Sequence, residues 1–193
     1  MEQILILSGS SGTAASLESF LKAAFRCSIR ILPSAYQARS VLEDDQRPGL
    51  VLIHSPLLDE TGIELAEYVT AHTRNGCLLL LRQEQAEQFA WLAERHQVIV
   101  LGRPVNKQLL YQLIRTVEIT MQRCACVLEE NAKLEQKLLD IRTIDRAKFL
   151  LMQYEGMTEA QSHSYLEKYA MDKRKRKPIA ALEIIDRINE QYL

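Results

Sequence analysis

The chain has 193 residues, of which 47% are hydrophobic and 25% are charged, and its formal net charge is −1. These values are typical of a globular protein, and no apolar stretch approaches the roughly 20 residues that span a bilayer. Because the first residues do not form a signal peptide either, we expect a cytoplasmic protein without a membrane partner. The four cysteines form no CxxC pair and have no histidines at zinc-ligand spacing, so no metal and no cofactor are expected.

The first hundred or so residues alternate between short apolar runs and amphipathic segments. Ile4 to Leu7 is uniformly apolar and is followed by Ser8-Gly9, which is typical of a strand buried on both faces. The pattern predicts strands at residues 4–7, 28–32, 50–53, 77–81 and 98–101. Helices are predicted at residues 14–25, 35–45, 61–72 and 84–94. Strands that alternate with helices in this way favour an α/β fold with a parallel sheet between two layers of helices.

A different pattern begins at Val105, since neither Gly nor Pro occurs from there until Gly156. We expect one helix of about fifty residues, most of which would project past a small domain. Its apolar residues follow a heptad repeat, in which eight of ten a and d positions are apolar or thiol. The predicted dimerisation residues are Leu110, Leu113, Val117, Cys124, Val127, Asn131, Leu134, Leu138 and Ile141.

Asn131 occupies an a position of this repeat. A buried Asn costs stability, but it pairs with its own copy across a parallel two-stranded coil and so fixes register and oligomeric state. We therefore predict a homodimer through a parallel coiled coil. The alternative is that the stripe packs within one chain and that Asn131 is solvated.

Two further helices are predicted after Gly156. The first begins at Thr158 and the second at Pro178, a position where the missing N–H of proline costs nothing. The residues expected to pack are Ser162, Tyr165, Leu166 and Tyr169 in the first helix, and Ile179, Leu182, Ile185 and Ile188 in the second. Together with the end of the long helix, they predict a three-helix module.

The segment from His54 to Ala66, HSPLLDETGIELA, resembles the phosphoacceptor strand end and following loop of response-regulator receiver domains. This resemblance implies a flavodoxin-like (βα)5 domain. It also places His54 where the family has its phosphoacceptor aspartate, Ser8 and Gly9 where it has its acidic pair, and Arg103 where it has lysine. Mg²⁺ in that family needs carboxylate oxygens, so we expect a degenerate pocket without aspartyl phosphorylation. A phosphohistidine at His54 is the alternative, and the domain could instead contact a sensor or regulatory protein or a small molecule.

The C-terminal segments IDRAKFLLMQ (144–153), GMTE (156–159), LEKYAM (166–171) and IA (179–180) resemble the ANTAR domain with its spacing. Such proteins bind paired stem-loops of leader transcripts as dimers and prevent a terminator hairpin from forming. Two residues depart from the family pattern: Phe149 stands where a glycine is usual, and Ser162 stands where alanine is usual. Phe149 could block RNA or offer a ring for stacking.

Residues 141–193 hold ten Lys and Arg against eight Asp and Glu, whereas the rest of the chain is net acidic. We expect the basic residues to meet phosphates, Phe149 and Tyr169 to stack on unpaired bases, and Gln153 to bond base edges. Met152 could equally pack or contact RNA. The candidate RNA-binding residues are Arg142, Arg146, Lys148, Phe149, Met152, Gln153, Tyr169, Lys173, Arg174, Lys175 and Arg176.

The expected organisation is a pseudo-receiver domain at residues 1–116, a coiled-coil linker at 117–141 and an ANTAR domain at 142–193. The expected function is transcription antitermination by a dimer that binds paired RNA stem-loops independently of aspartyl phosphorylation. The main alternative is a dimeric interaction scaffold that has lost RNA binding, and a DNA-binding regulator is weaker because the basic patch is small. An enzyme is not expected, because no nucleophile–base pair, carboxylate dyad or metal cluster occurs.

Overall fold

A computed structural model describes residues 3–44 and 49–192 of the chain. The chain divides into two compact units, Met1–Ala125 and Cys126–Leu193. The last residue of the predicted helix 35–45, Asp45, lies outside the described residues.

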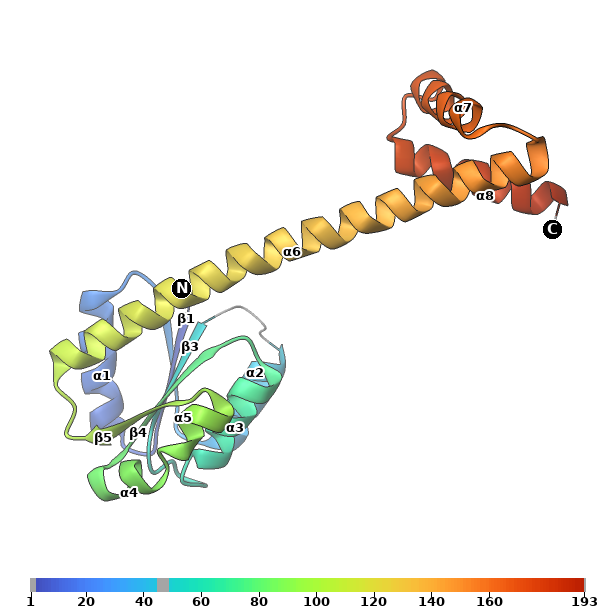
Figure 1. The fold of residues 1–193 in the computed structure, drawn as a ribbon. Helices are drawn as coiled ribbons and strands as arrows, with labels where there is room; N and C mark the ends of the chain where they lie inside the picture. Colours follow the sequence, from blue (N-terminus) through green and yellow to red (C-terminus); the bar gives the residue numbers. More distant parts are fainter. Residues whose placement is uncertain (1–2, 45–48, 193) are drawn as a thin grey trace. The chain divides into compact units, whose positions relative to one another are not determined.

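The N-terminal unit is built on a parallel sheet (Figure 1). Its described strands are β1 (Gln3–Ser8), β2 (Ser28–Leu32), β3 (Gly49–His54), β4 (Gly76–Arg82) and β5 (Ile99–Arg103), in the order β2-β1-β3-β4-β5. All neighbouring pairs are parallel. This strand order is that of flavodoxin-like folds, so the predicted fold class is confirmed.

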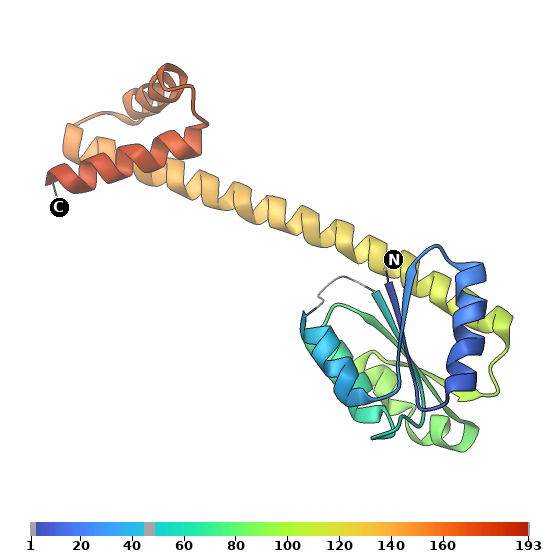
Figure 2. The ribbon, with the colours of Figure 1, turned by 180° about the vertical axis from the view of Figure 1, so that it is seen from behind.

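Helices cover both faces of the sheet (Figure 2). One face packs against α1 (Ser11–Ala24) and the first turns of α6 (Lys107–Glu155), through Leu21, Leu110 and Ile114. The other face packs against α2 (Ala35–Asp44), α3 (Ile63–His72) and α5 (Trp91–His96). α6 is continuous over 49 residues, so the long helix expected from the absence of Gly and Pro is confirmed.

One predicted helix is wrong. Residues 84–94 form two short helices, α4 (Gln83–Gln88) and α5, instead of one. At the junction, the Ala90 N–H donates to the Glu87 carbonyl at 3.4 Å and the Leu92 N–H to the Phe89 carbonyl at 3.1 Å. These tighter, three-residue turns redirect the chain, so that Phe89 packs against the core and Leu92 is fully buried.

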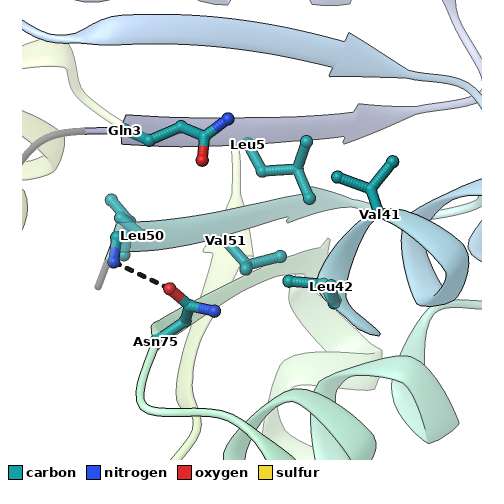
Figure 3. A pocket seen from close by; sticks show the side chains of 8 residues that line it. Gln3, Leu5, Val41, Leu42, Leu50, Val51 and Asn75 are labelled. Carbon is teal, nitrogen blue, oxygen red and sulfur yellow. Dashed lines mark hydrogen bonds between the residues drawn. The ribbon is translucent and has the colours of Figure 1, made fainter. Parts of the chain in front are cut away.

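Figure 3 shows a small pocket beside the first residues of β1 and β3. The side-chain oxygen of Asn75 accepts a hydrogen bond from the Gly49 N–H at 2.7 Å and ties the loop before β4 to the start of β3. The pocket has a volume of about 20 Å³, which is room for about one water molecule. A pocket of this size does not suit a ligand.

The C-terminal unit packs the end of α6 against α7 (Glu159–Asp172) and α8 (Lys177–Tyr192). α7 begins with the reciprocal bonds of a capping box: the Gln161 N–H donates to Thr158 Oγ1 at 3.3 Å, and the Thr158 N–H donates to Gln161 Oε1 at 2.8 Å. Thr158 is thus the helix start that the sequence predicts. The core residues are Ala147, Leu150, Leu151, Leu166, Ala170, Ala180, Ala181, Ile184, Ile185 and Ile188.

The predicted buried stripe of α8 is half correct. Ile185 and Ile188 are buried, but Ile179 and Leu182 are exposed. Ala180, Ala181 and Ile184 take the inner positions instead, and the two alanines are fully buried. The prediction followed the largest apolar residues, whereas small side chains let α8 approach its neighbours closely. No helix within residues 3–44 and 49–192 has both the length and the apolar character needed to cross a membrane.

Candidate functional site

Three of the predicted pocket residues converge at the carboxyl ends of the strands in the N-terminal unit. His54 ends β3, Ser8 ends β1 and Arg103 ends β5. The Ser8 hydroxyl lies 3.3 Å from His54 Nδ1, and Arg103 Nη1 lies 2.5 Å from His54 Nε2. Ser8 and His54 are buried. The expected pocket is therefore assembled, and it contains a hydroxyl, an imidazole and a guanidinium.

The hydrogen bonds fix the tautomer of His54. Arg103 can only donate, so Nε2 must be the acceptor and Nδ1 must carry the proton and donate to the Ser8 hydroxyl. That hydroxyl also accepts from the Ser10 N–H and donates to the Ser10 carbonyl, both at 3.2 Å. Burial and the neighbouring Arg103 charge lower the pKa of His54. His54 is thus held neutral and serves as an acceptor.

Gly9 and Asp59 do not add groups to this pocket. A Cβ at Gly9 would lie 2.9 Å from the Pro56 carbonyl oxygen, so a side chain does not fit there. The Asp59 carboxylate instead accepts the N–H groups of Ala35 and Tyr36, at 2.8 and 2.9 Å, at the start of α2. Although desolvation acts to raise the pKa of Asp59, these backbone hydrogen bonds lower it. Asp59 is a capping residue here.

We expect the N-terminal unit to lose stability as the pH falls below about 6.5, the ordinary pKa of histidine. The folded-state pKa of His54 is lowered, so the unfolded chain binds the proton more tightly and acid favours unfolding; the stability is fully present above that pH. The measurement is the urea midpoint against pH, followed by the fluorescence of Trp91, which lies in this unit. His54→Gln should flatten the profile, and an equal slope in both proteins would contradict the assignment.

In the C-terminal unit, four of the predicted RNA-binding residues form one exposed stripe on α6. Arg142, Arg146, Phe149 and Gln153 recur every three or four residues and so share a helix face. Phe149 is 61% exposed. Among the described residues, no carboxylate pairs with either arginine. The stripe therefore presents two free guanidinium groups, an aromatic ring and an amide.

Lys148 does not belong to that stripe. Its Nζ lies 2.8 Å from Asp145 Oδ1 and 3.9 Å from Glu159 Oε1, and its side chain is 18% exposed. The hydrogen bond that Lys148 donates to Asp145, together with the negative charges of Asp145 and Glu159, raises the pKa of Lys148. The lysine joins α6 to the first turn of α7, so its charge is already balanced within the chain.

The turn between α7 and α8 carries the predicted basic run, and all of Lys173, Arg174, Lys175 and Arg176 are exposed. Lys175 pairs with Glu183, and the charge of Lys173 also acts on Glu183, whereas Arg174 and Arg176 form no ion pair in the part of the chain that the structure describes. Arg174 adopts φ +53°, and its N–H donates to the Met171 carbonyl at 3.0 Å. Residues in this left-handed conformation end helices and are usually glycine.

Replacing Arg174 with glycine should remove one cation without harming the fold. Glycine adopts a positive φ without the roughly 1 kcal/mol cost that other residues incur. We expect Arg174→Gly to keep the unfolding midpoint within a few degrees and to weaken RNA binding severalfold, with a lower slope of log affinity against log salt. Filter-binding titrations at several salt concentrations measure both quantities. An unchanged affinity and slope would remove Arg174 from the interface.

The two other predicted RNA-binding residues, Tyr169 and Met152, differ in how exposed their side chains are. Tyr169 is partly buried against the C-terminal core, stacks on Tyr165 and donates from its hydroxyl to Glu183 Oε2 at 3.4 Å. The expectation that Tyr169 packs within this unit is therefore confirmed, and its stacking on an unpaired base stays a prediction. Met152 is exposed and lies beside the stripe.

Only some of the predicted dimerisation residues are exposed and could contact a second copy of the chain. Leu110 and Val117 are buried in the core of the N-terminal unit together with Ile114, so they are corrected from the seam to the core. Leu113 is half-buried. The remaining positions are exposed over the following turns of α6: Cys124, Val127, Asn131, Leu134, Leu138 and Ile141. We call these six residues the seam. The boundary expected after residue 116 thus falls within a helix that packs on the sheet.

Sequence reasoning missed Arg187, which connects all three helices of the C-terminal unit. Its Nη2 lies 2.6 Å from Glu155 Oε1, its Nη1 donates to the Tyr165 hydroxyl at 2.8 Å, and its guanidinium lies 5.6 Å from the Tyr165 ring centroid. An arginine on the polar side of an amphipathic helix is ordinarily solvated, so nothing in the sequence distinguished it.

Comparison with known proteins gives a family for part of the C-terminal unit and a fold for the N-terminal unit. Residues 132–185 match the ANTAR domain family. The response regulator StyR aligns with 96% of this chain and 98% of its own, at 13% identity and a TM-score of 0.61. A CheY-like receiver domain protein from Methanospirillum hungatei JF-1 aligns with 64% of this chain and 98% of its own, at 18% identity and a TM-score of 0.56.

An adenylate cyclase from Rhodopirellula baltica aligns with 68% of this chain and 97% of its own, at 16% identity and a TM-score of 0.60. At these identities the structural matches show the fold alone. No curated protein matches the sequence. ANTAR and receiver domains are regulatory families, and the ANTAR domain is an RNA-binding antitermination module. The chain therefore combines an ANTAR domain at residues 132–185 with an N-terminal domain that has the fold of response-regulator receiver domains.

Proposed function

We propose that this chain is a transcription antitermination regulator that binds paired RNA stem-loops as a homodimer, without aspartyl phosphorylation. The observation that carries the proposal is the exposed stripe of Arg142, Arg146, Phe149 and Gln153 inside the ANTAR domain. It combines groups that neutralise phosphates, stack on an unpaired base and bond to a base edge. Because transcripts are made in the cytoplasm, we propose that the protein acts there.

Arg142, at the start of the stripe, and the basic turn lie toward the same end of the C-terminal unit. The ion pair of Arg187 with Glu155 places the later part of α8 beside the end of α6, and α8 runs alongside α6 in both views (Figures 1 and 2). Lys177 precedes Arg187 by about 15 Å of helix, and Arg142 precedes Glu155 by about 20 Å. A single RNA hairpin could therefore contact both groups of cations.

The faces of α6 that would serve dimerisation, packing and RNA binding do not overlap. At 3.6 residues per turn, the centre of the stripe lies roughly 150° from the core residues Ala147 and Leu151, and roughly 80° from the end of the seam at Leu138 and Ile141. A parallel dimer through the seam would thus leave both copies of the stripe exposed. Two linked modules on paired hairpins gain affinity through effective concentration.

The test is a titration of the full chain with a leader RNA from its own operon that carries two stem-loops. We expect one dimer per RNA by light scattering, without any phosphodonor, and an affinity that falls steeply with salt. An RNA with one stem-loop is the matched control and should bind at least tenfold more weakly. A dimer that ignores both RNAs would favour the interaction scaffold.

Phe149→Ala should weaken binding of the paired stem-loops about tenfold, because stacking of one base on an aromatic ring contributes about 1–3 kcal/mol. The ring is exposed, so the unfolding midpoint should not fall. Gel-shift titration and thermal unfolding provide the two readouts. Met171→Ala removes another exposed apolar side chain of the same unit, outside the stripe, and serves as the control. Tighter binding by Phe149→Ala would show that the ring obstructs RNA.

A further inference from the structure

A groove in the N-terminal unit lies beside the Ser8–His54–Arg103 pocket. It has a volume of about 440 Å³, within the range of small-molecule sites. α1, the end of β5 and the first turns of α6 form its walls. Leu17, Phe20, Leu80 and Leu110 contribute much of the apolar lining.

Two cationic side chains contribute to the lining of the groove. Arg103 and Lys107 line it, together with the hydroxyl residues Thr13 and Ser16, and no carboxylate is among the lining residues. Within residues 3–44 and 49–192, Arg103 has no acidic partner: its bonds go to His54 Nε2 and to the Leu81 carbonyl. Burial and the nearby Arg82 charge lower the pKa of Arg103. A partly buried cation without a counter-charge favours an anion beside it.

The backbone adds to this preference. Thr13 lies in the first turn of α1, and Lys107 is the first residue of α6. The N-terminal turn of a helix carries partial positive charge and has N–H groups without partners in the helix. α6 begins at the groove, so its first turn adds partial positive charge to that of the two side-chain cations, whereas α1 lines the groove along its side, from Thr13 to Phe20.

We propose that this groove binds a small organic anion with an apolar body, of the aromatic or branched-chain carboxylate class. Its carboxylate lies between Arg103 and Lys107, and its apolar body lies against Leu17 and Phe20. A bare inorganic anion would leave the apolar wall in water, and a neutral apolar molecule would leave Arg103 without a counter-charge. Because Arg103 also bonds His54, an occupied groove is linked directly to the position that corresponds to the phosphoacceptor of receiver domains.

The test uses two fluorescent probes that differ by one charge: 8-anilinonaphthalene-1-sulfonate, which is anionic, and N-phenyl-1-naphthylamine, its neutral counterpart. We expect the full chain to bind the anionic probe at least tenfold more tightly. Phenylacetate should displace it, whereas 2-phenylethanol should not. Equal affinity for the two probes, or equal displacement by acid and alcohol, would overturn the proposal.

Substitutions then locate the site. Lys107→Gln and Arg103→Gln should each weaken the anionic probe at least fivefold, with little change for the neutral one. Ser16→Trp fills the groove from an exposed position and should abolish binding of the anion. Ser19→Trp makes the same change at an exposed serine of α1 that does not line the groove, and it should bind normally. If Lys107→Gln and Ser16→Trp both bind the anion like the parent protein, the groove is not the site.

Discussion

Leu134→Asp combined with Leu138→Asp is expected to convert the protein to a monomer and to weaken binding of paired stem-loops about 100-fold or more. Both side chains are exposed on the seam of the single chain. In a parallel coil they would face their own copies, where two pairs of buried carboxylates repel each other and lose their hydration. The bivalent advantage, of the order of 10²–10⁴, would be lost with the dimer. Analytical ultracentrifugation and gel-shift titration measure the two effects.

Ala132→Asp combined with Gln136→Asp is the matched control. It adds the same charge at exposed positions of the same helix turns, off the seam. We expect this variant to stay dimeric and to bind RNA within a few-fold of the parent protein. If the seam variant stays dimeric too, the seam is not the interface.

The two exposed cysteines test the direction of pairing. Cys124 lies on the seam and Cys126 does not, although both are exposed. Cys124 occupies heptad position a, so in a parallel dimer its side chain faces the Cys124 side chain of the other copy. Mild oxidation should therefore give a covalent dimer of Cys126→Ser and not of Cys124→Ser. The reverse result would exclude the parallel register.

Arg187→Met should destabilise the C-terminal unit by about 2 kcal/mol. The substitution removes the ion pair with Glu155 and the bond to the Tyr165 hydroxyl, and hydrogen bonds to charged groups contribute about 1.5–3 kcal/mol before solvent exposure reduces them. For a unit of this size, the midpoint should fall by about 10 °C. Circular dichroism follows the helices, while the fluorescence of Trp91, in the N-terminal unit, should not change.

Asp186→Ala, at the neighbouring exposed position of α8, is the control and should leave the transition in place. Arg187→Lys keeps the positive charge, but lysine has no planar group that can contact both partners. Its unfolding midpoint should therefore lie between those of Arg187→Met and Asp186→Ala. If Arg187→Met unfolds at the same temperature as the parent protein, the contacts of Arg187 do not stabilise the packing of the three helices.

Much of the fold could be predicted from the sequence, because strands buried on both faces are uniformly apolar and α6 lacks helix breakers. The break between α4 and α5 could not be predicted, because the α4 sequence QEQAEQ has no apolar face. The break is explained by the burial of Leu92 in the core, which only the tertiary structure shows. α8 shows the same limit, because a stripe of isoleucine and leucine is the stronger sequence signal while Ala180 and Ala181 make the contact.

The sequence also predicts the candidate site only in part. It places the site residues on the correct helices, but it does not predict which of them form ion pairs within the chain. Lys148 carries the same charge as Arg146, yet only Lys148 lies within reach of Asp145 and Glu159. Leu110 and Val117 fit the heptad repeat because a helix that packs on a sheet and a helix that packs on its copy need the same apolar spacing. Sequence periodicity gives the buried face and leaves open what covers it.

Position 54 bears on how long a signal can last. A receiver domain that carries an acyl phosphate keeps its state until that bond is hydrolysed, so its chemistry acts as a timer and each cycle consumes a phosphodonor. His54 has no carboxylate, and Ser8 and Arg103 occupy both of its ring nitrogens, so no acyl phosphate can form there. A signal received in the adjoining groove would end when the ligand dissociates, at a rate set by affinity and without consumption of a high-energy compound.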